Sequence, residues 1–248
     1  MPSSWTWPES MLVGCWTGHP PTCASGGLYR QARPIAERAL AVTEAALGPA
    51  NPDFAWRCDA LGIALWRLGD LAGARAKFER AVDIGEAALG RDHLYVAAWR
   101  NNLGTVLQDL GDLEGAKAQL ERALAIDEAA RGPDHPHMAI RRNNLGRVLQ
   151  ALGDLEGARV QLERALELGE AALGPDHLAV AIWRSNLGRV LQDLGDLEGA
   201  RVQLERALAI GEAALGPDHP DVATYRGNLG RVLGALQEAP GEEPGLAF

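Results

Sequence analysis

The chain repeats itself at a fixed period, and this periodicity constrains its fold more than any other feature. Four consecutive blocks of equal length cover residues 53–94, 95–136, 137–178 and 179–220. The last two blocks differ at only 8 of their 42 positions. Self-similarity at such a period is typical of arrays in which one supersecondary unit is stacked on its neighbours. We therefore expect a chain of repeats without a single central core.

Half-blocks flank the four complete ones. Residues 27–52 align with the second half of a block, with Gly27 in register with Gly69. Residues 221–237 align with a first half, with Asn228 in register with Asn186. The sequence thus predicts an array over 27–237, made of a half repeat, four full repeats and a closing helix, at 27–52, 53–94, 95–136, 137–178, 179–220 and 221–237. An irregular N-terminal segment at 1–26 and a disordered tail at 238–248 are expected outside it.

Each block carries the start and stop signals of two helices. In the fourth block, Gly195 can take the left-handed conformation that ends a helix, and Asp196 can cap the next one. Pro220, preceded by Asp218 and His219, suits the first turn of the following first helix. The Gly-Asp pair recurs in every full block, so we expect one short turn inside each helix pair.

Apolar residues within a block lie three and four positions apart, as in an amphipathic helix. In the second helix of the fourth block they include Leu197, Ala200, Leu204 and Leu208. Small residues mark the predicted points of close helix approach, namely Gly104, Gly146 and Gly188 in first helices and Ala116, Ala158 and Ala200 in second helices. A pair of this kind has no core of its own, so neighbouring pairs must stack.

These residues resemble the tetratricopeptide repeat, in the 42-residue variety of kinesin light chains and many bacterial regulatory proteins. The second block carries the motif as Leu103-Gly104, Gly111-Asp112, Ala116, Leu120 and Ala123-Leu124, and the match covers residues 27–237. The resemblance implies an all-α fold, an α-solenoid that winds as a right-handed superhelix of antiparallel helix pairs. It also implies that the first helices line a concave groove that binds an extended peptide or a partner helix.

Two positions depart from the family pattern. Arginine replaces the usual large apolar residue three positions before Leu-Gly, at Arg100, Arg142, Arg184 and Arg226. Leucine replaces the usual tyrosine three positions after the glycine, at Leu107, Leu149 and Leu191. The first departure resembles bacterial arrays attached to nucleotide-binding signalling ATPases, so one alternative is a severed regulatory segment of such an ATPase. The chain itself has no GxxxxGK[ST] phosphate-binding loop.

Carried onto this sequence, the groove positions hold rows of polar residues. The candidate peptide-binding residues are Asn102, Asn144, Asn186, Asn228, Arg147, Arg189, Arg231, Gln108, Gln150 and Gln192. An amide can pair with the backbone of an extended peptide, and a guanidinium presents a fork to carboxylates. The alternative is that duplication simply copied surface residues, with each asparagine bonded to a neighbouring helix. Ala60 and Ile63 break the pattern, which confines the candidate site to residues 95–236.

Other residue groups favour structural roles. A histidine follows Asp in each loop between repeats, at His93, His135, His177 and His219. A spacing of 42 residues places them too far apart to share one metal ion, so helix capping is expected. Trp56 and Trp66 align with groove positions, either as an aromatic end to the groove or as packing. No arrangement typical of catalysis is evident, so we expect neither enzyme activity nor a cofactor or bound metal.

Charge and hydropathy narrow the class of partner. The net charge of -9 argues against nucleic acid as a target, since phosphate binding needs clustered Lys and Arg. The uncharged stretch 11–25 is broken by glycine and proline, so no membrane partner and a cytoplasmic location are expected. The sequence predicts a non-catalytic scaffold that binds an extended, acidic segment of another protein. A third hypothesis is self-association through the incomplete N-terminal repeat.

Helices are also expected at the two ends of the array. Residues 28–47 should form a helix that packs on the next repeat with Leu40 and Leu47 facing inward. Residues from about Val222 to Leu236 should form the closing helix, because the Pro- and Gly-containing segment after it cannot continue the helix.

Overall fold

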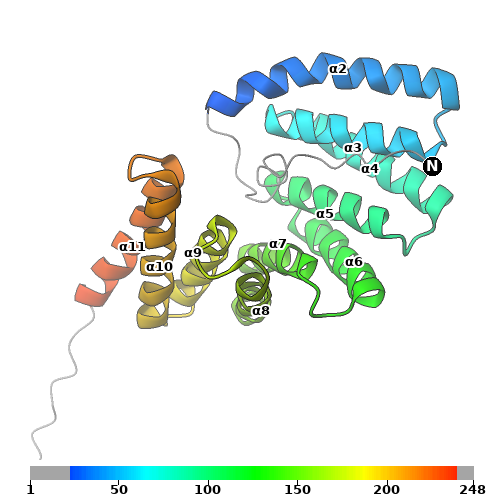
Figure 1. Cartoon of the computed structure of the whole chain (residues 1–248). Coiled ribbons are helices and arrows are strands. Elements are labelled where there is room, and N and C mark those ends of the chain that lie inside the picture. The colour runs from blue at the N-terminus through cyan, green and yellow to red at the C-terminus, as the bar shows by residue number, and fades with distance from the viewer. Residues whose placement is uncertain (1–22, 239–248) are drawn as a thin grey trace, which may run out of the picture.

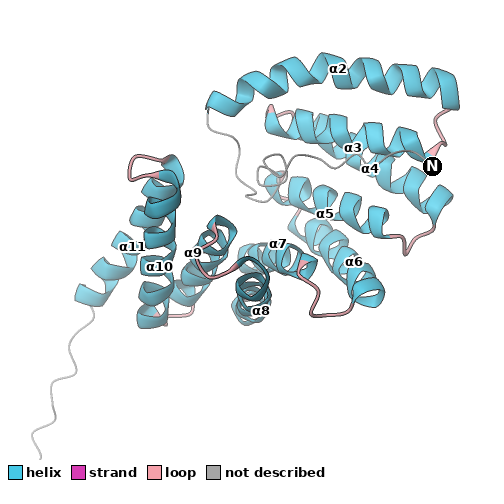
Figure 2. Cartoon of the chain, in the orientation of Figure 1, coloured by secondary structure: helices cyan, strands magenta, loops and turns pink. Residues whose placement is uncertain are grey.

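A computed structural model of the chain describes residues 23–238. Every regular element in this range is an α-helix, and successive helices pack in antiparallel pairs into an α-solenoid (Figures 1 and 2). This confirms the predicted fold class. None of the helices in the described range combines the length and the apolar character needed to span a membrane.

The helices fall into two alternating types that follow the blocks of the sequence. The second-type helices are α2 (Cys23–Leu47), α4 (Leu71–Leu89), α6 (Leu113–Arg131), α8 (Leu155–Leu173) and α10 (Leu197–Leu215). The first-type helices are α3 (Pro52–Arg67), α5 (Leu94–Asp109), α7 (His137–Leu152), α9 (Leu178–Asp193) and α11 (Pro220–Glu238). We call them second helices and first helices below.

The turns inside the repeats have the predicted chemistry. Gly195 has φ +85°, and the three equivalent glycines are also in the left-handed region. The Asp196 carboxylate accepts a hydrogen bond from the backbone N–H of Gly199 at 2.9 Å, as each equivalent aspartate does in its own repeat. Histidine takes the same role between repeats, since Nδ1 of His93 accepts from the N–H of Tyr95 at 3.2 Å. These caps satisfy backbone donors that a helix start leaves free.

The two helices of a repeat touch most closely at a glycine. A Cβ added to Gly104 would lie 2.7 Å from Cγ of Leu120, and the same holds for Gly146 against Leu162. The alanines predicted at close approaches are also fully buried: Ala116, Ala158 and Ala200. Larger side chains would separate the helices, so these small residues set the spacing within each pair.

Contacts between successive repeats come in two chemical kinds. In three junctions a glycine of a second helix lies against an aromatic ring of the next first helix: Gly85 with Trp99, Gly169 with Trp183, and Gly211 with Tyr225. Between α6 and α7 the same two positions hold Asp127 and Arg141, whose Nε donates to Oδ2 of Asp127 at 2.8 Å. Arg131 also approaches this carboxylate, which is 1% exposed. The α6–α7 junction is therefore charged where these three are apolar.

The N-terminal helix differs from prediction at two points. α2 begins at Cys23, so residues 23–26 are helical, while the remainder of the expected irregular segment lies outside the described residues, as does 239–248 of the expected tail. Leu40 is buried as expected, but the inward orientation expected for Leu47 is wrong, because its side chain is 50% exposed. In three of the four later junctions the next first helix has an aromatic residue at the position of the exposed Arg57.

The charged junction should depend on both partners. Replacing Asp127 by Ala leaves Arg141 without its buried partner, so we expect the free energy of unfolding to fall by about 3 kcal/mol. Asp127→Gly combined with Arg131→Leu and Arg141→Trp copies the neighbouring apolar junctions and should recover most of this loss. Urea unfolding of the three proteins tests this expectation. A triple variant less stable than Asp127→Ala would contradict it.

The closing helix should stabilise the whole array. Val222 and Tyr225 of α11 are buried against α10, so deletion of residues 221–248 exposes apolar surface and should lower the melting temperature by roughly 10 °C. Deletion of residues 239–248 alone should change it little. Calorimetry on dilute samples measures the melting temperatures of the full chain and of both truncated chains. Equal melting temperatures of all three would refute the role of α11 as the closing helix.

Candidate functional site

The first helices contact one another across repeats, and together they form one continuous surface. We call the surface of α3, α5, α7, α9 and α11 the first-helix face. Side chains four and seven residues apart on one helix share a side of it, so Asn144 and Arg147 project near Ile140 on α7. All ten predicted binding residues belong to these helices. The structure therefore places them on one face, in rows that cross the helices.

The asparagines of this face form hydrogen bonds between repeats. Each Nδ2 donates to the residue 43 positions earlier, on the preceding first helix: Asn102 to Asp59 at 2.9 Å, Asn144 to Asn101 at 3.0 Å, Asn186 to Asn143 at 2.8 Å, and Asn228 to Ser185 at 3.2 Å. We call this series the amide ladder. Three of its donors, on α7, α9 and α11, are buried. The amide N–H groups expected to hold a peptide backbone are thus engaged between helices, as the duplication alternative supposed.

The three arginines of the face have a different environment. Arg189 and Arg231 are exposed and Arg147 is half-buried. None of the three forms an ion pair with a carboxylate of the described residues; Arg231 donates only to Oδ1 of Asn228. Burial lowers the pKa of Arg147, against an opposing effect of Asp109, while nearby Arg189 lowers it further. These guanidinium groups therefore form a row of basic groups on α7, α9 and α11 without a carboxylate partner among the described residues.

A hollow of about 210 Å³ lies between α9 and α11 on this face. Arg189 and Arg231 line it, together with the ladder residues Asn186 and Asn228. Tyr225 and Asp221 complete part of its wall. The structure therefore brings four of the ten predicted residues together in one depression, with two basic groups at its edge.

The arginines that depart from the family pattern are structural. Arg142 donates to Gln161 of its own second helix at 2.8 Å and to Glu128 of the preceding one. Arg100 and Arg184 make the equivalent pair of bonds. One guanidinium thus joins three helices, which explains why a charged residue replaces a large apolar one. The signal in the sequence is a Glu 14 residues before each of these arginines and a Gln 19 residues after it.

The predicted glutamines and Trp66 lie near the C-terminal ends of the first helices. Nε2 of Gln150 donates to Asp193 at 2.6 Å, and Nε1 of Trp66 donates to Asp109 at the same distance. Gln108 and Gln192 are half-buried, and the positions 43 residues after them hold Ala151 and Ala235, whose side chains cannot accept a hydrogen bond. Trp66 and Gln150 therefore join successive first helices, which favours packing as the role of Trp66.

The N-terminal end of the face carries an acidic group that sequence reasoning missed. Asp59 occupies the ladder position that holds Asn101 and Asn143 in the next repeats. Burial raises the pKa of Asp59 to about 6, against an opposing effect of the hydrogen bond from Asn102. The aromatic rings of Trp56 and Tyr95 lie nearby on the same two helices, with centroids 4.4 Å apart. This end therefore differs from the basic end at α9 and α11.

Fold and face together define a helical repeat solenoid with a binding surface on its first helices. The profile of the tetratricopeptide-repeat family matches residues 22–87, 55–129, 95–170, 138–213 and 180–240. The chain belongs to this family.

Solved structures support the same conclusion. The crystal structure of BtubC (BKLC) from P. vanneervenii is 26% identical, with a TM-score of 0.67 over 79% of this chain and 78% of that one. A putative kinesin light chain from P. anserina with nearly identical repeats is 24% identical, with a TM-score of 0.64 over 77% of this chain and 90% of that one. A search of curated protein sequences found no match.

Asp59 should make stability depend on pH in a defined direction. Its pKa is about 6 in the folded chain and near 3.8 when unperturbed, so between these values the folded chain binds a proton that the unfolded chain does not. Its contribution to stability thus rises as pH falls through this window. Asp59→Asn, which copies Asn101, should be more stable than the natural chain by on the order of 2 kcal/mol at pH 7.5.

The difference between the two proteins should shrink as the pH approaches about 4. Urea unfolding of both proteins at several pH values measures it. A constant difference across this range would show that the Asp59 charge is not the cause.

Proposed function

We propose that the chain is a non-catalytic scaffold that binds an extended, acidic segment of a partner protein on the first-helix face of α7, α9 and α11. The observation that carries the proposal is the row formed by Arg147, Arg189 and Arg231, which have no carboxylate partner among the described residues. Protein association through such repeats is the general role of the family to which the chain belongs. A free guanidinium presents several donors in a fixed fork that suits a carboxylate.

The spacing of this row supports an extended ligand. Equivalent positions recur once in every block, so the three guanidinium groups follow one another across neighbouring first helices. A single compact anion would reach one or two of them, whereas an extended chain with several carboxylates can reach all three. Each exposed contact contributes about 1 kcal/mol or less, so selectivity requires several in series.

The amide ladder contributes to this proposal mainly by positioning. Its N–H groups are engaged between helices, and they hold successive first helices in a fixed relation. Asn228 also accepts from Arg231, which orients that guanidinium at the edge of the hollow. The backbone-pairing role first expected for the asparagines is thus replaced by orientation of the arginine row.

A synthetic acidic peptide tests the proposal directly. A fluorescein-labelled peptide of alternating Glu and Ser should bind the chain, and the version with Lys in place of Glu should not. The combined change Arg147→Ala, Arg189→Ala and Arg231→Ala should reduce the affinity at least about tenfold, because three charge contacts are lost. Fluorescence anisotropy measures the affinity, and added salt should weaken it.

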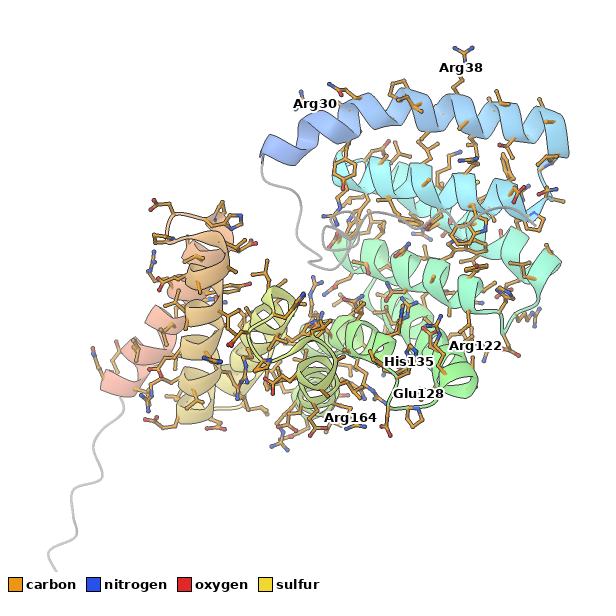
Figure 3. All side chains as sticks on the ribbon, viewed as in Figure 1. Arg30, Arg38, Arg122, Glu128, His135 and Arg164 are labelled. Atoms are coloured by element: carbon orange, nitrogen blue, oxygen red, sulfur yellow. The ribbon has the colours of Figure 1, made fainter. Side chains whose placement is uncertain are left out.

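A matched variant removes three other positive charges. Arg122, Arg164 and Arg206 lie on second helices, where each pairs with an aspartate of the preceding repeat; Figure 3 labels two of them. Their combined replacement by Ala changes the net charge equally and should leave the affinity within about twofold. Equal losses in the two triple variants would refute a specific site on the first-helix face, and so would equal binding of the Lys peptide.

A further inference from the structure

The two terminal helices of the array each leave one face open. α2 is a second helix that packs on α3, and the described residues provide no first helix of its own repeat. α11 is a first helix that packs on α10, and no second helix follows it in the described range. The two helices lie at opposite ends of the array (Figure 1). The end at α2 therefore lacks a first helix, which is the type of α11, and the end at α11 lacks a second helix, which is the type of α2.

Exposed apolar side chains mark both open faces. Val42 of α2 is 60% exposed, whereas its equivalents in the full repeats are 2 to 7% exposed: Ile84, Ile126, Leu168 and Ile210. Leu233 of α11 is 38% exposed, whereas its equivalents are 4 to 7% exposed: Leu65, Leu107, Leu149 and Leu191. Because these positions are buried wherever both helices of a repeat are present, each open face lacks the other helix of a repeat.

The glycine that sets helix spacing is also unused in α11. Gly104 and Gly146 lie against leucines of their own second helices, but a Cβ added to Gly230 would meet nothing within 4 Å. On α2, Ala39 is half-buried, although its equivalents in the full repeats are fully buried: Ala81, Ala123, Ala165 and Ala207. The small residues of a close helix pair are thus present on both open faces.

A series of ion pairs between repeats has unpaired members near both ends, and Arg80 is one of them because Ala50 stands at the position of its aspartate. Arginines of second helices pair with aspartates in the loop that joins the preceding repeat to their own. The pairs are Arg122 with Asp92, Arg164 with Asp134, and Arg206 with Asp176. The next aspartate in this series is Asp218, and the equivalent arginine of α2 is Arg38. Both are exposed and neither forms an ion pair with a described residue. Figure 3 shows Arg38 pointing away from α3, on the open side of α2.

We propose that a second copy of this chain covers each open face: α11 of one copy and α2 of the next pack together as the two helices of one composite repeat. Val42 and Ala39 of the second copy then pack on Ala223 of the first, as Ile126 and Ala123 pack on Ala97 within a full repeat. Gly230 faces Ala36, as Gly188 faces Leu204, and Leu233 packs on the first half of α2. Asp218 pairs with Arg38. α11 remains helical through Glu238, and its residues Gln237 and Glu238 stand where the full repeats have their Gly-Asp turn. Two helices of different chains need no such turn. Because the two surfaces differ and lie at opposite ends, repeated association gives an open filament.

Variants at the two ends test this assembly by mixing. The natural chain should show a mass that increases with concentration beyond that of a dimer in light scattering after size-exclusion chromatography. Val42→Asp and Leu233→Asp should each be monomeric with unchanged melting, because both side chains are exposed in the single chain. An equimolar mixture should form a dimer and nothing larger, since one intact α11 face and one intact α2 face remain.

Several results would overturn the proposal. They are a natural chain that stays monomeric at every concentration, single variants that still associate, or a mixture of the two variants that does not form the dimer.

The ion pair provides a second, independent measurement. Arg38→Asp should weaken association by about tenfold or more, because it faces Asp218 with a like charge, and Asp218→Arg in the same chain should restore it. Arg30→Asp is the matched control on α2, since the equivalent position is exposed in every full repeat. Failure of the double variant to recover association, or an equal effect of Arg30→Asp, would contradict the proposed register.

Discussion

The whole structure depends on the fact that one helix pair of this sequence cannot bury its apolar residues alone. Each second helix of a full repeat is covered on one side by its own first helix and on another by the first helix of the next repeat. The spacing of these contacts is set by Gly104 and its equivalents, which let a leucine approach the backbone. Burial is therefore shared between neighbours, and a helix at either end keeps part of its apolar surface in water.

Polar side chains in the junctions fix how the repeats are oriented. The arginine typified by Arg142 joins three helices, and the amide ladder joins successive first helices. Buried polar groups are costly unless they are hydrogen-bonded, so a rotated or shifted neighbour would leave several of them unsatisfied. The result is a first-helix face on which Arg147, Arg189 and Arg231 have fixed relative positions. The binding proposal depends on this rigidity as much as on charge.

Sequence reasoning predicted the features that local rules determine. The two helices of each block, the left-handed Gly195, the cap at Asp196 and the close approach at Gly104 all follow from backbone sterics and periodicity, and the structure confirms them. The role of Asn144 could not be predicted from such local rules, because an amide on a helix face can bond either a ligand or a neighbouring helix. The relative rotation of the helices decides between the two. The exposure of Leu47 likewise could not be read from the periodicity of α2 alone.

The charged junction bears on how such a chain can gain or lose repeats. A deletion of one whole block joins two repeats that were not neighbours. Loss of 179–220 would place Gly169 beside Tyr225, a compatible pair of the kind found elsewhere in the chain. Loss of 95–136 would instead bury Arg141 against Gly85, and loss of 137–178 would bury Asp127 against Trp183. Because of the Asp127–Arg141 pair, neither the second nor the third repeat can be deleted alone without leaving a buried charge unpaired.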